Sequence, residues 1–438
     1  MPAPASPDPV RRWRRWPLGP YAGLYALLFV LLAVLLAVLL PPTGFAADTW
    51  LWVRWAQYSR AHGLANVYAV HGNNYNPLYH YVLGLFGQLA GSDANIQTYS
   101  HYLKLLTLPF DVGGALLAAS LARTDRRRFV ASLLLLGNLG YLYNTLIWGQ
   151  VDAIYSALVL AAVLLALRGC VAWSAVLFVL GLSAKLQALI FLPPLLLLWA
   201  PPFRAAPRRL LGAALAAGLT LGLVLLPFAV GGARNYLDVI VGINRQAVGY
   251  YPFLSMRAYN WWYLTAAGNP LTRLDTDLWH GLSYRRWGML LFAAAAAVVL
   301  LPLLGQAWAA LRRRARFDDG LVLLSCALVP LVFCFFNTQM HERYWHSAVL
   351  FAAAYGFSSG RYALLALLSL AYLLNLDAVM SYLGLTAALP EPRAARLIAV
   401  LFALIIAWAT RELYRRAGRL RAATLPPQLR PAGPATVA

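Results

Sequence analysis

Long runs of apolar residues alternate with short polar segments along most of the chain. The stretch from Tyr21 to Leu40 is typical, because it carries no charge over its whole length. An α-helix rises 1.5 Å per residue, so a run of roughly twenty residues crosses a hydrocarbon layer of about 30 Å. The pattern predicts an all-α polytopic membrane protein with about twelve transmembrane helices. We place these spans near residues 18–41, 103–122, 129–147, 150–167, 171–184, 186–200, 209–230, 287–310, 319–336, 344–359, 362–384 and 395–410.

Two of the segments between spans are long, and we predict that both are external loops. The first, 42–102, contains an amphipathic stretch and then a short apolar segment from Leu78 to Ala90. About thirteen residues are too few to span, so this segment should lie at the interface or re-enter the membrane. The second loop, 231–286, is rich in Tyr, Trp, Asn and Arg, which favours contact with the outer leaflet.

Composition and charge agree with a membrane protein and give its orientation. Hydrophobic residues make up 61% of the chain and charged residues 12%, against roughly 25% charged in a soluble domain. The net charge is +21, but the arginines cluster between apolar runs, as at Arg123 to Arg128, rather than forming a stripe for nucleic acid. By the positive-inside rule both termini are cytoplasmic, in the inner membrane of the cell. Residues 1–410 then form one transmembrane domain, and 411–438 a flexible basic tail.

Ionisable residues near membrane depth are costly and usually functional. Asp48 follows the first span directly. One interpretation is that it caps the amphipathic helix. The other is that it acts as a general base, since a carboxylate at the rim of a membrane cavity can take a proton from an acceptor hydroxyl.

A second set of polar residues lies in the Trp148-Gly149-Gln150-Val151-Asp152 stretch and at Lys185. Asp152 at a helix N-terminus and Lys185 at a helix C-terminus are each favourable in the helix dipole alone. Alternatively, the two pair with each other, or Lys185 meets a lipid phosphate. The amide of Gln150 is suited to sugar hydroxyls. The flanking spans 171–184 and 186–200 are short, so Lys185 should lie below the membrane surface.

The third candidate is the string His341-Glu342-Arg343 before an apolar run. It is either an interfacial anchor with an internal ion pair, or a phosphate site in which Arg343 and His341 donate to phosphate oxygens and Glu342 orients them. Weaker candidates for an acceptor or sugar are Tyr75, Asn76 and Tyr251; turn formation and interface anchoring are their commoner roles. The sequence holds no P-loop, dinucleotide-binding turn, nucleophile elbow or HExxH motif.

With these segments in place, the chain resembles GT-C class glycosyltransferases over roughly residues 20–410. The resemblance is to bacterial relatives of the PIG-V-like family, the second mannosyltransferase of GPI-anchor synthesis. It rests on Asp48, Tyr75-Asn76-Pro77-Leu78-Tyr79, Trp148 to Asp152, Lys185-Leu186-Gln187 with Pro193-Pro194, and Met340-His341-Glu342-Arg343-Tyr344.

The resemblance implies a helical membrane fold with a catalytic cavity on the external face, a lipid-phosphate sugar donor, and a glycan or lipid-glycan acceptor. The class uses an acidic residue of the first external loop, which carries over onto Asp48. Many members show paired acids there, whereas Asp48 stands alone and Asp93 lies far along the loop. We therefore assign no metal ligands and no cofactor; a divalent ion is not indicated.

These observations lead to one hypothesis and three rivals. The hypothesis is an inverting membrane glycosyltransferase that moves a hexose, with mannose favoured, from a polyprenyl-phosphate donor to an acceptor hydroxyl. The main rival is a transporter or flippase of a lipid-linked or polar solute, whose marks would be inverted repeats and mid-span charges. A polymerase or ligase of lipid-linked glycans would share the topology. A purely structural membrane component would leave His341 to Arg343 unexplained.

Overall fold

The computed structural model describes residues 22–313 and 315–424, and helices dominate it. The start of the predicted first span, the arginine cluster at 11–15 and the end of the predicted basic tail lie outside the described residues. The helices of the membrane part are α2 (Ala22–Val38), α6 (Leu103–Ala119), α7 (Asp125–Leu136), α8 (Leu139–Tyr143), π-helix η3 (Asn144–Trp148), α9 (Asp152–Leu167), α10 (Val171–Ala184), 3₁₀-helix η4 (Leu186–Phe191), α11 (Leu192–Ala205), α12 (Arg208–Val230), α15 (Tyr284–Arg313), α16 (Asp319–Phe336), α17 (His346–Ser359), α18 (Ala363–Met380) and α19 (Glu391–Thr424).

Several of these helices are fit to cross a membrane, which makes the chain a multi-pass membrane protein. Within the described residues, seven helices have the length and hydropathy for a span, or eight if the pair from Asp125 to Trp148, bent by 53°, is one span. Three shorter apolar helices, α2, α9 and α10, occupy further predicted spans. A helix lies in each of the twelve predicted segments, but the count of about twelve crossings stays a prediction.

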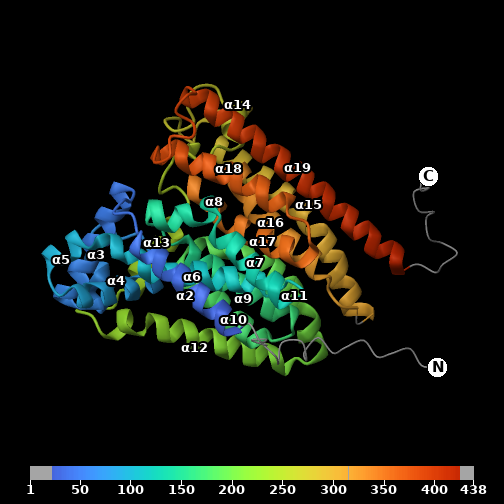
Figure 1. Cartoon of the computed structure of the whole chain (residues 1–438), viewed down its shortest axis with the longest axis horizontal. Helices are drawn as coiled ribbons and strands as arrows, with labels where there is room; N and C mark the ends of the chain where they lie inside the picture. The colour runs from blue at the N-terminus through green and yellow to red at the C-terminus, as the bar shows by residue number, and fades with distance from the viewer. Residues whose placement is uncertain (1–21, 314, 425–438) are drawn as a thin grey trace.

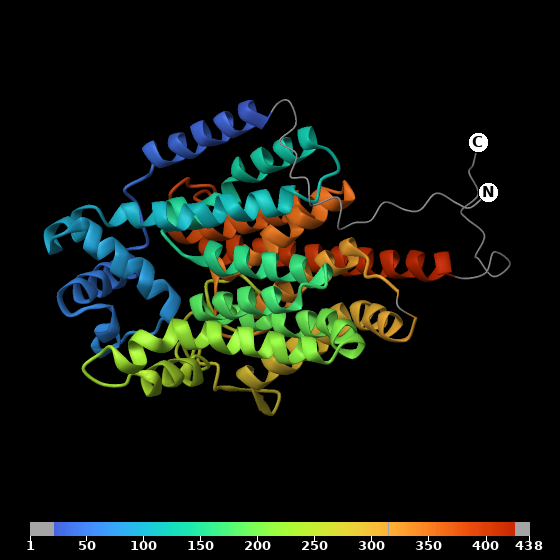
Figure 2. The ribbon, with the colours of Figure 1, turned by 90° about the horizontal axis from the view of Figure 1, so that it is seen from below.

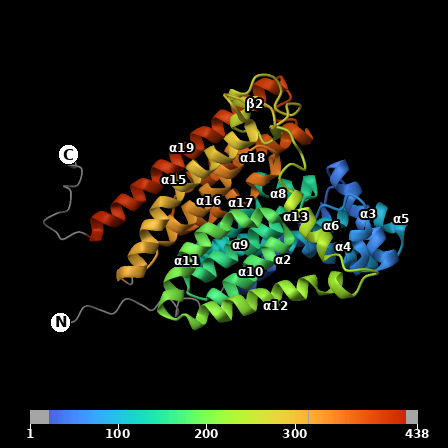
Figure 3. The same ribbon diagram turned by 180° about the vertical axis from the view of Figure 1, so that it is seen from behind.

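The most buried helices lie in the middle of the bundle and the exposed apolar ones at its edges. Nearly every side chain of α16 and α17 is buried. By contrast, α12 carries a row of exposed leucines, and so does α2. Figure 1 shows α12 along one edge of the molecule and α15 and α19 along the opposite one, and Figure 3 shows the same order from behind. Apolar surface of this extent fits contact with lipid acyl chains.

The first long segment between predicted spans, 42–102, folds into helices that pack on one another at one end of the molecule (Figures 1 and 2). These are α3 (Ala46–His62), the 3₁₀-helix η1 (Leu64–Ala69), α4 (Pro77–Ala90), α5 (Asp93–Thr98) and η2 (Ser100–Tyr102). As expected, the apolar segment near 78–90 forms a helix too short to span, and it packs against α3. Whether α4 lies at the interface or re-enters stays a prediction.

The second long segment between predicted spans, 231–286, consists of short helices, short strands and turns, and it lies against the segment after α16. It contains α13 (Leu237–Gln246), β1 (Ser255–Met256), α14 (Trp261–Thr265), β2 (Leu278–Trp279) and β3 (Leu282–Ser283). Strand β1 pairs in parallel with β4 (Met340–His341), so that Ser255 lies opposite Met340 and Met256 opposite His341. This pairing fixes the backbone on which the third candidate segment begins.

The predicted tail begins inside a helix. α19 continues from Glu391 to Thr424, well past the predicted boundary at residue 410. Glu412 within it is an ion-pair partner of Arg361 and Arg419. The part of the tail up to Thr424 is therefore helical, and its flexibility and cytoplasmic position stay predictions for the remainder.

Candidate active site

Asp48 lies in the first turn of α3, but it does not cap the helix. The N-cap position is Phe45, and the carboxylate of Asp48 instead faces the end of η3. Its Oδ2 accepts hydrogen bonds from Trp148 Nε1 at 3.0 Å and Gln150 Nε2 at 2.6 Å. The capping interpretation is therefore wrong. Both bonds reach the same oxygen, so Oδ1 is the oxygen that points away from these donors and can accept a proton.

Gln150 links this carboxylate to the polar turn of the first loop. Its Oε1 accepts a hydrogen bond from the Tyr75 hydroxyl at 3.2 Å, while its Nε2 holds Asp48. The chain can turn here because Gly149 adopts a φ of +82°, which a residue with a Cβ rarely does. Tyr75 and Gln150, two of the predicted residues, thus lie beside Asp48 and set its orientation.

The predicted pairing of Asp152 with Lys185 is confirmed. Lys185 Nζ lies 2.6 Å from Asp152 Oδ1, and both side chains are buried. The other carboxylate oxygen accepts from Asn144 Nδ2 at 3.3 Å. Lys185 adopts an extended conformation at the end of α10, which aims its stem into the bundle. The ammonium also lies over the rings of Tyr344 and Tyr75, at 5.5 Å and 6.0 Å from their centroids.

His341, Glu342 and Arg343 are all buried between α16 and α17. Arg343 Nη1 lies 3.2 Å from Glu342 Oε1 and 3.3 Å from His341 Nδ1. Among the described residues, neither Arg343 Nε nor His341 Nε2 has a hydrogen-bond partner. An unmet N–H of a buried arginine is costly, so these atoms are suited to a ligand that supplies oxygen acceptors. The ring of Tyr251 meets His341 edge-on at 5.1 Å.

The three predicted segments converge: Gln150 donates to Asp48 at 2.6 Å, and Lys185 lies over the ring of Tyr344, next to Arg343. Burial lowers the pKa of Arg343, but the carboxylates of Asp48 and Glu342 outweigh it and hold that pKa well above its usual value. Burial raises the pKa of Glu342 to about 7, although Arg343 opposes the shift. Burial, Arg343 and Lys185 together depress the pKa of His341, so its imidazole is neutral at pH 7. The charges of Asp48, Lys185 and Arg343 are therefore close enough to influence one another.

Asp275, which the sequence analysis did not select, holds the backbone just before His341 through hydrogen bonds. It is fully buried and accepts two hydrogen bonds from Arg285, at 3.0 Å and 2.8 Å. It also accepts from Thr338 Oγ1 at 2.9 Å and Gln339 Nε2 at 2.5 Å. Gln339 adopts a positive φ of 65°, a strained value that these contacts offset. The sequence offers little signal for it, because Asp275 is one of three acids in this loop, with Asp238 and Asp277.

The weaker candidates divide into two kinds. Tyr75 lies in the site, and Tyr251 lies at its edge beside His341. Asn76 is occupied elsewhere: its Nδ2 donates to the Leu182 carbonyl at 2.9 Å, and its Oδ1 accepts from Asn244 at 2.9 Å. These bonds tie the start of α4 to α10 and α13, so the structure favours a positioning role for Asn76.

A buried pair away from these segments was also missed. His346 Nε2 lies 4.0 Å from Asp111 Oδ1, both side chains are fully buried, and Tyr141 stacks on the imidazole at 5.0 Å. Asp111 lies within α6, and only the fold brings it close to His346 at the start of α17. In the described part of the chain, no three His, Cys, Asp or Glu side chains gather in the manner of a metal site.

Comparison with known families supplies the class of protein. The family model described as glycosyltransferase family 87 matches residues 75–334, more than half of the chain. The chain is therefore a membrane glycosyltransferase, an enzyme. It belongs to glycosyltransferase family 87. The matched part includes Tyr75, Gln150, Asp152 and Lys185, while Asp48 and His341 to Arg343 flank it. No curated protein matches the chain.

Proposed function

We propose that this enzyme transfers a hexose from a polyprenyl-phosphate donor to a hydroxyl of a glycan or lipid glycan. Mannose is the favoured sugar, from the resemblance to PIG-V-like enzymes of the GT-C class. The site would face the non-cytoplasmic side of the inner membrane, because the arginine clusters occupy the opposite ends of the helices. The observation that carries the proposal is the carboxylate of Asp48, held at one oxygen only, in a site that also contains the buried cations Arg343 and Lys185.

The donor phosphate would bind at Arg343 and His341. Arg343 Nε and His341 Nε2 are both buried and have no hydrogen-bond partner among the described residues, and a phosphate offers oxygens to both. Neutral His341 presents one N–H when its tautomer carries the proton on Nε2, since Nδ1 faces Arg343. Glu342 fixes the guanidinium, and Lys185 adds positive charge close by. These groups would stabilise the charge that develops on the phosphate as the sugar leaves.

Asp48 would act as the general base of a single inverting displacement. The acceptor oxygen attacks the anomeric carbon, the bond from that carbon to the phosphate oxygen breaks, and its electron pair leaves with the polyprenyl phosphate. The acceptor proton moves to Asp48 Oδ1. Trp148 and Gln150 hold Oδ2 and so keep the carboxylate oriented, while Asp152 keeps Lys185 in place. Gln150 and Tyr75 would also contact sugar hydroxyls.

The test is covalent transfer by the purified protein in nanodiscs. Radiolabelled polyprenyl-phosphate mannose, glucose and galactose are each incubated with alkyl glycosides and lipid glycans, and products are separated by chromatography. The proposal expects a labelled glycoside and released polyprenyl phosphate in equal amounts. Uptake of label into vesicles without a new covalent product would instead support a transporter or flippase.

A further inference from the structure

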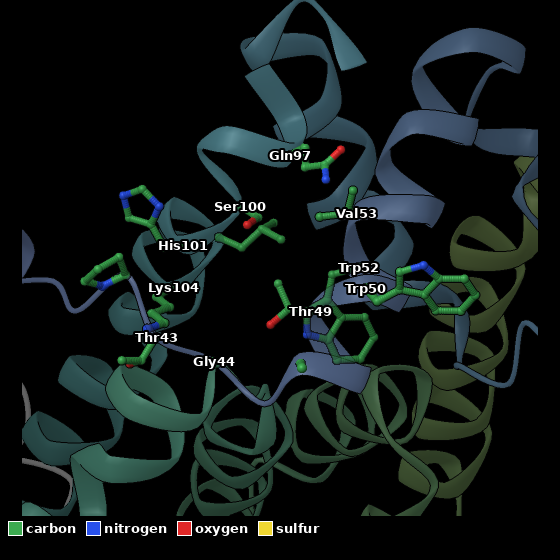
Figure 4. Close-up of a pocket in the computed structure, with 14 residues that line it drawn as sticks. Thr43, Gly44, Thr49, Trp50, Trp52, Val53, Gln97, Ser100, His101 and Lys104 are labelled. Carbon is green, nitrogen blue, oxygen red and sulfur yellow. The ribbon is translucent and has the colours of Figure 1, made fainter. Parts of the chain in front are cut away.

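A cavity of about 340 Å³ lies beside the Asp48 turn, and neither Arg343 nor His341 lines it. It is bounded by the chain that leads into α3, by the first turns of α3, and by η2 with the start of α6 (Figure 4). Its volume is within the range of small-ligand sites. None of the groups that we assign to the donor phosphate lines it, so it is a separate space.

The polar side chains around the cavity can all donate hydrogen bonds. They come from Thr43, Thr49, Gln97, Ser100, His101 and Lys104. Of the 14 lining residues, all in the described part of the chain, none is acidic. Hydroxyl, amide and imidazole groups can donate as well as accept hydrogen bonds, whereas an ammonium only donates. With no carboxylate in the lining, every polar side chain can present a donor to a ligand that is rich in acceptors.

Lys104 gives this cavity its charge. Its side chain is buried, and Nζ donates to the carbonyls of Pro41 at 2.7 Å and Leu146 at 2.6 Å. An ammonium has three donors, so one remains, and Figure 4 places this amine at the cavity edge beside Thr43. Within the described residues, no carboxylate pairs with Lys104, whereas Lys185 has Asp152. A buried cation without a counter-charge is costly, which favours an anionic ligand here.

Trp52 is a second residue of the cavity lining with an unused hydrogen-bond donor. Its side chain is 3% exposed, lines the cavity, and its Nε1 has no hydrogen-bond partner among the described residues. Trp52 and Thr49 are three residues apart in α3, so they present their polar atoms on the same helix face. Buried indole N–H groups normally find an acceptor.

Two glycines beside the Asp48 turn form part of the cavity lining. Gly44 and Gly149 both line it, and the amide of Phe45 donates to the carbonyl of Trp148 at 2.9 Å between them. A Cβ at Gly44 would lie 2.6 Å from Thr49 Oγ1 and would fill the space. Gly149 sits between the two residues that hold Asp48. A ligand in the cavity therefore lies next to the proposed base.

We propose that this cavity is the acceptor subsite and that it binds a phosphate group carried by the acceptor. This inference rests on the proposed function, since it assumes that Asp48 activates an acceptor hydroxyl. Lys104 and Trp52 would donate to the phosphate oxygens, and Gln97, Ser100 and Thr49 would complete the donor set. The phosphate is either the diester of a lipid headgroup or the monoester of a soluble acceptor, because both present the same oxygens.

The kinetic test adds a negative charge to the cavity without disturbing its buried bonds. Gln97 is exposed, so Gln97→Glu should fold normally, and Gln88→Glu makes the same change on α4, outside the cavity. We expect Gln97→Glu to lower the ratio of kcat/KM for a phosphate-bearing acceptor to kcat/KM for a neutral alkyl glycoside about tenfold, through like-charge repulsion. Gln88→Glu should leave this ratio as in wild type. An unchanged ratio in Gln97→Glu would overturn the proposal.

A binding test separates this proposal from the proposed function. Thermal stability of wild type and Gln97→Glu is measured in nanodiscs with phosphodiester lipid, and in neutral nanodiscs with inorganic phosphate. Stabilisation of wild type but not of Gln97→Glu supports the subsite. If only the lipid stabilises the protein, the bound group is the phosphate of a lipid headgroup. If only inorganic phosphate does, it is the phosphate of a soluble acceptor. No stabilisation by either overturns it. Because no sugar transfer is measured, the result stands even if the chain uses a different donor.

Discussion

Removing the charge of Lys185 should destabilise the protein in a pH-dependent way. Lys185→Met keeps the length of the side chain but leaves the Asp152 carboxylate buried without its ion-pair partner at 2.6 Å. Only the longer bond from Asn144 remains. Breaking a buried pair by deleting one partner typically costs about 3–5 kcal/mol.

The cost has an upper limit, because the stranded aspartate can take up a proton. Protonating a group with an ordinary pKa of about 3.9 costs about 1.36 kcal/mol per pH unit, so about 4 kcal/mol at pH 7 and about 1.5 kcal/mol at pH 5. Lys185→Met should therefore lose about 4 kcal/mol of unfolding free energy at pH 7 and recover more than half of that loss at pH 5. The double variant with Asp152→Asn contains no buried charge at this pair and should recover most of it at both values.

The assay is equilibrium unfolding in mixed micelles at pH 5 and pH 7. Arg60→Met is the matched control, since its partner Asp93 is exposed and that pair, at 2.8 Å, should contribute no more than about 1 kcal/mol at either pH. A loss in Lys185→Met that is the same at both pH values would refute the reasoning. It would show that lost packing, rather than the uncompensated carboxylate, sets the cost.

The further predictions concern Glu342, Arg343 and Asp275, which lie in or contact the segment after α16. Because the pKa of Glu342 is about 7, donor turnover should rise with pH through 7 as Glu342 ionises and pairs with Arg343, and Glu342→Gln should lose this limb of the rate profile. The pKa of Glu342 in the folded protein lies above that in the unfolded chain, so Glu342 adds stability below about pH 4.5 that is lost as pH rises through 7. The difference in unfolding free energy between wild type and Glu342→Gln, measured across this pH range, should therefore fall as pH rises. Arg343→Lys should weaken donor binding at least tenfold by direct titration, because a point charge cannot replace a guanidinium fork; unchanged affinity would favour the anchor interpretation. Asp275→Asn should weaken its contacts with Arg285, lower kcat/KM about tenfold and expose the second loop to proteolysis, whereas Asp277→Asn, on an exposed side chain, should do neither.

Hydropathy was enough to find the helices, because burial in lipid makes nearly every span an uninterrupted apolar run. It could not find the bend of 53° between α7 and α8, since a bend changes direction without changing composition. It also placed the end of the last helix too early. The polar residues after 410 suggested a tail, yet Glu412 pairs with Arg361 in the turn between α17 and α18, and only the fold brings those two together.

The candidate site was partly predictable for a similar reason. A charge beside a span is visible in sequence, so Asp48, Asp152, Lys185 and Arg343 could be selected singly. Their partners were less visible: the pairing of Asp152 with Lys185 was only one of several alternatives, and Asp275 lies in a loop where an acid is unremarkable by composition. Capping by Asp48 failed as an interpretation because tertiary donors, Trp148 and Gln150, compete for the carboxylate. Local position alone does not reveal them.

The most direct measurement is single-turnover sugar transfer by Asp48→Asn, preloaded with radiolabelled donor in nanodiscs and mixed with acceptor. Asparagine keeps the shape and can still accept from Trp148, but it cannot take the acceptor proton. Asp93→Asn, on an exposed acid of the same loop, is the matched control. The account predicts transfer slower by about 10²–10⁴-fold in Asp48→Asn with donor affinity unchanged, and wild-type transfer in Asp93→Asn. Near-normal transfer by Asp48→Asn would contradict it.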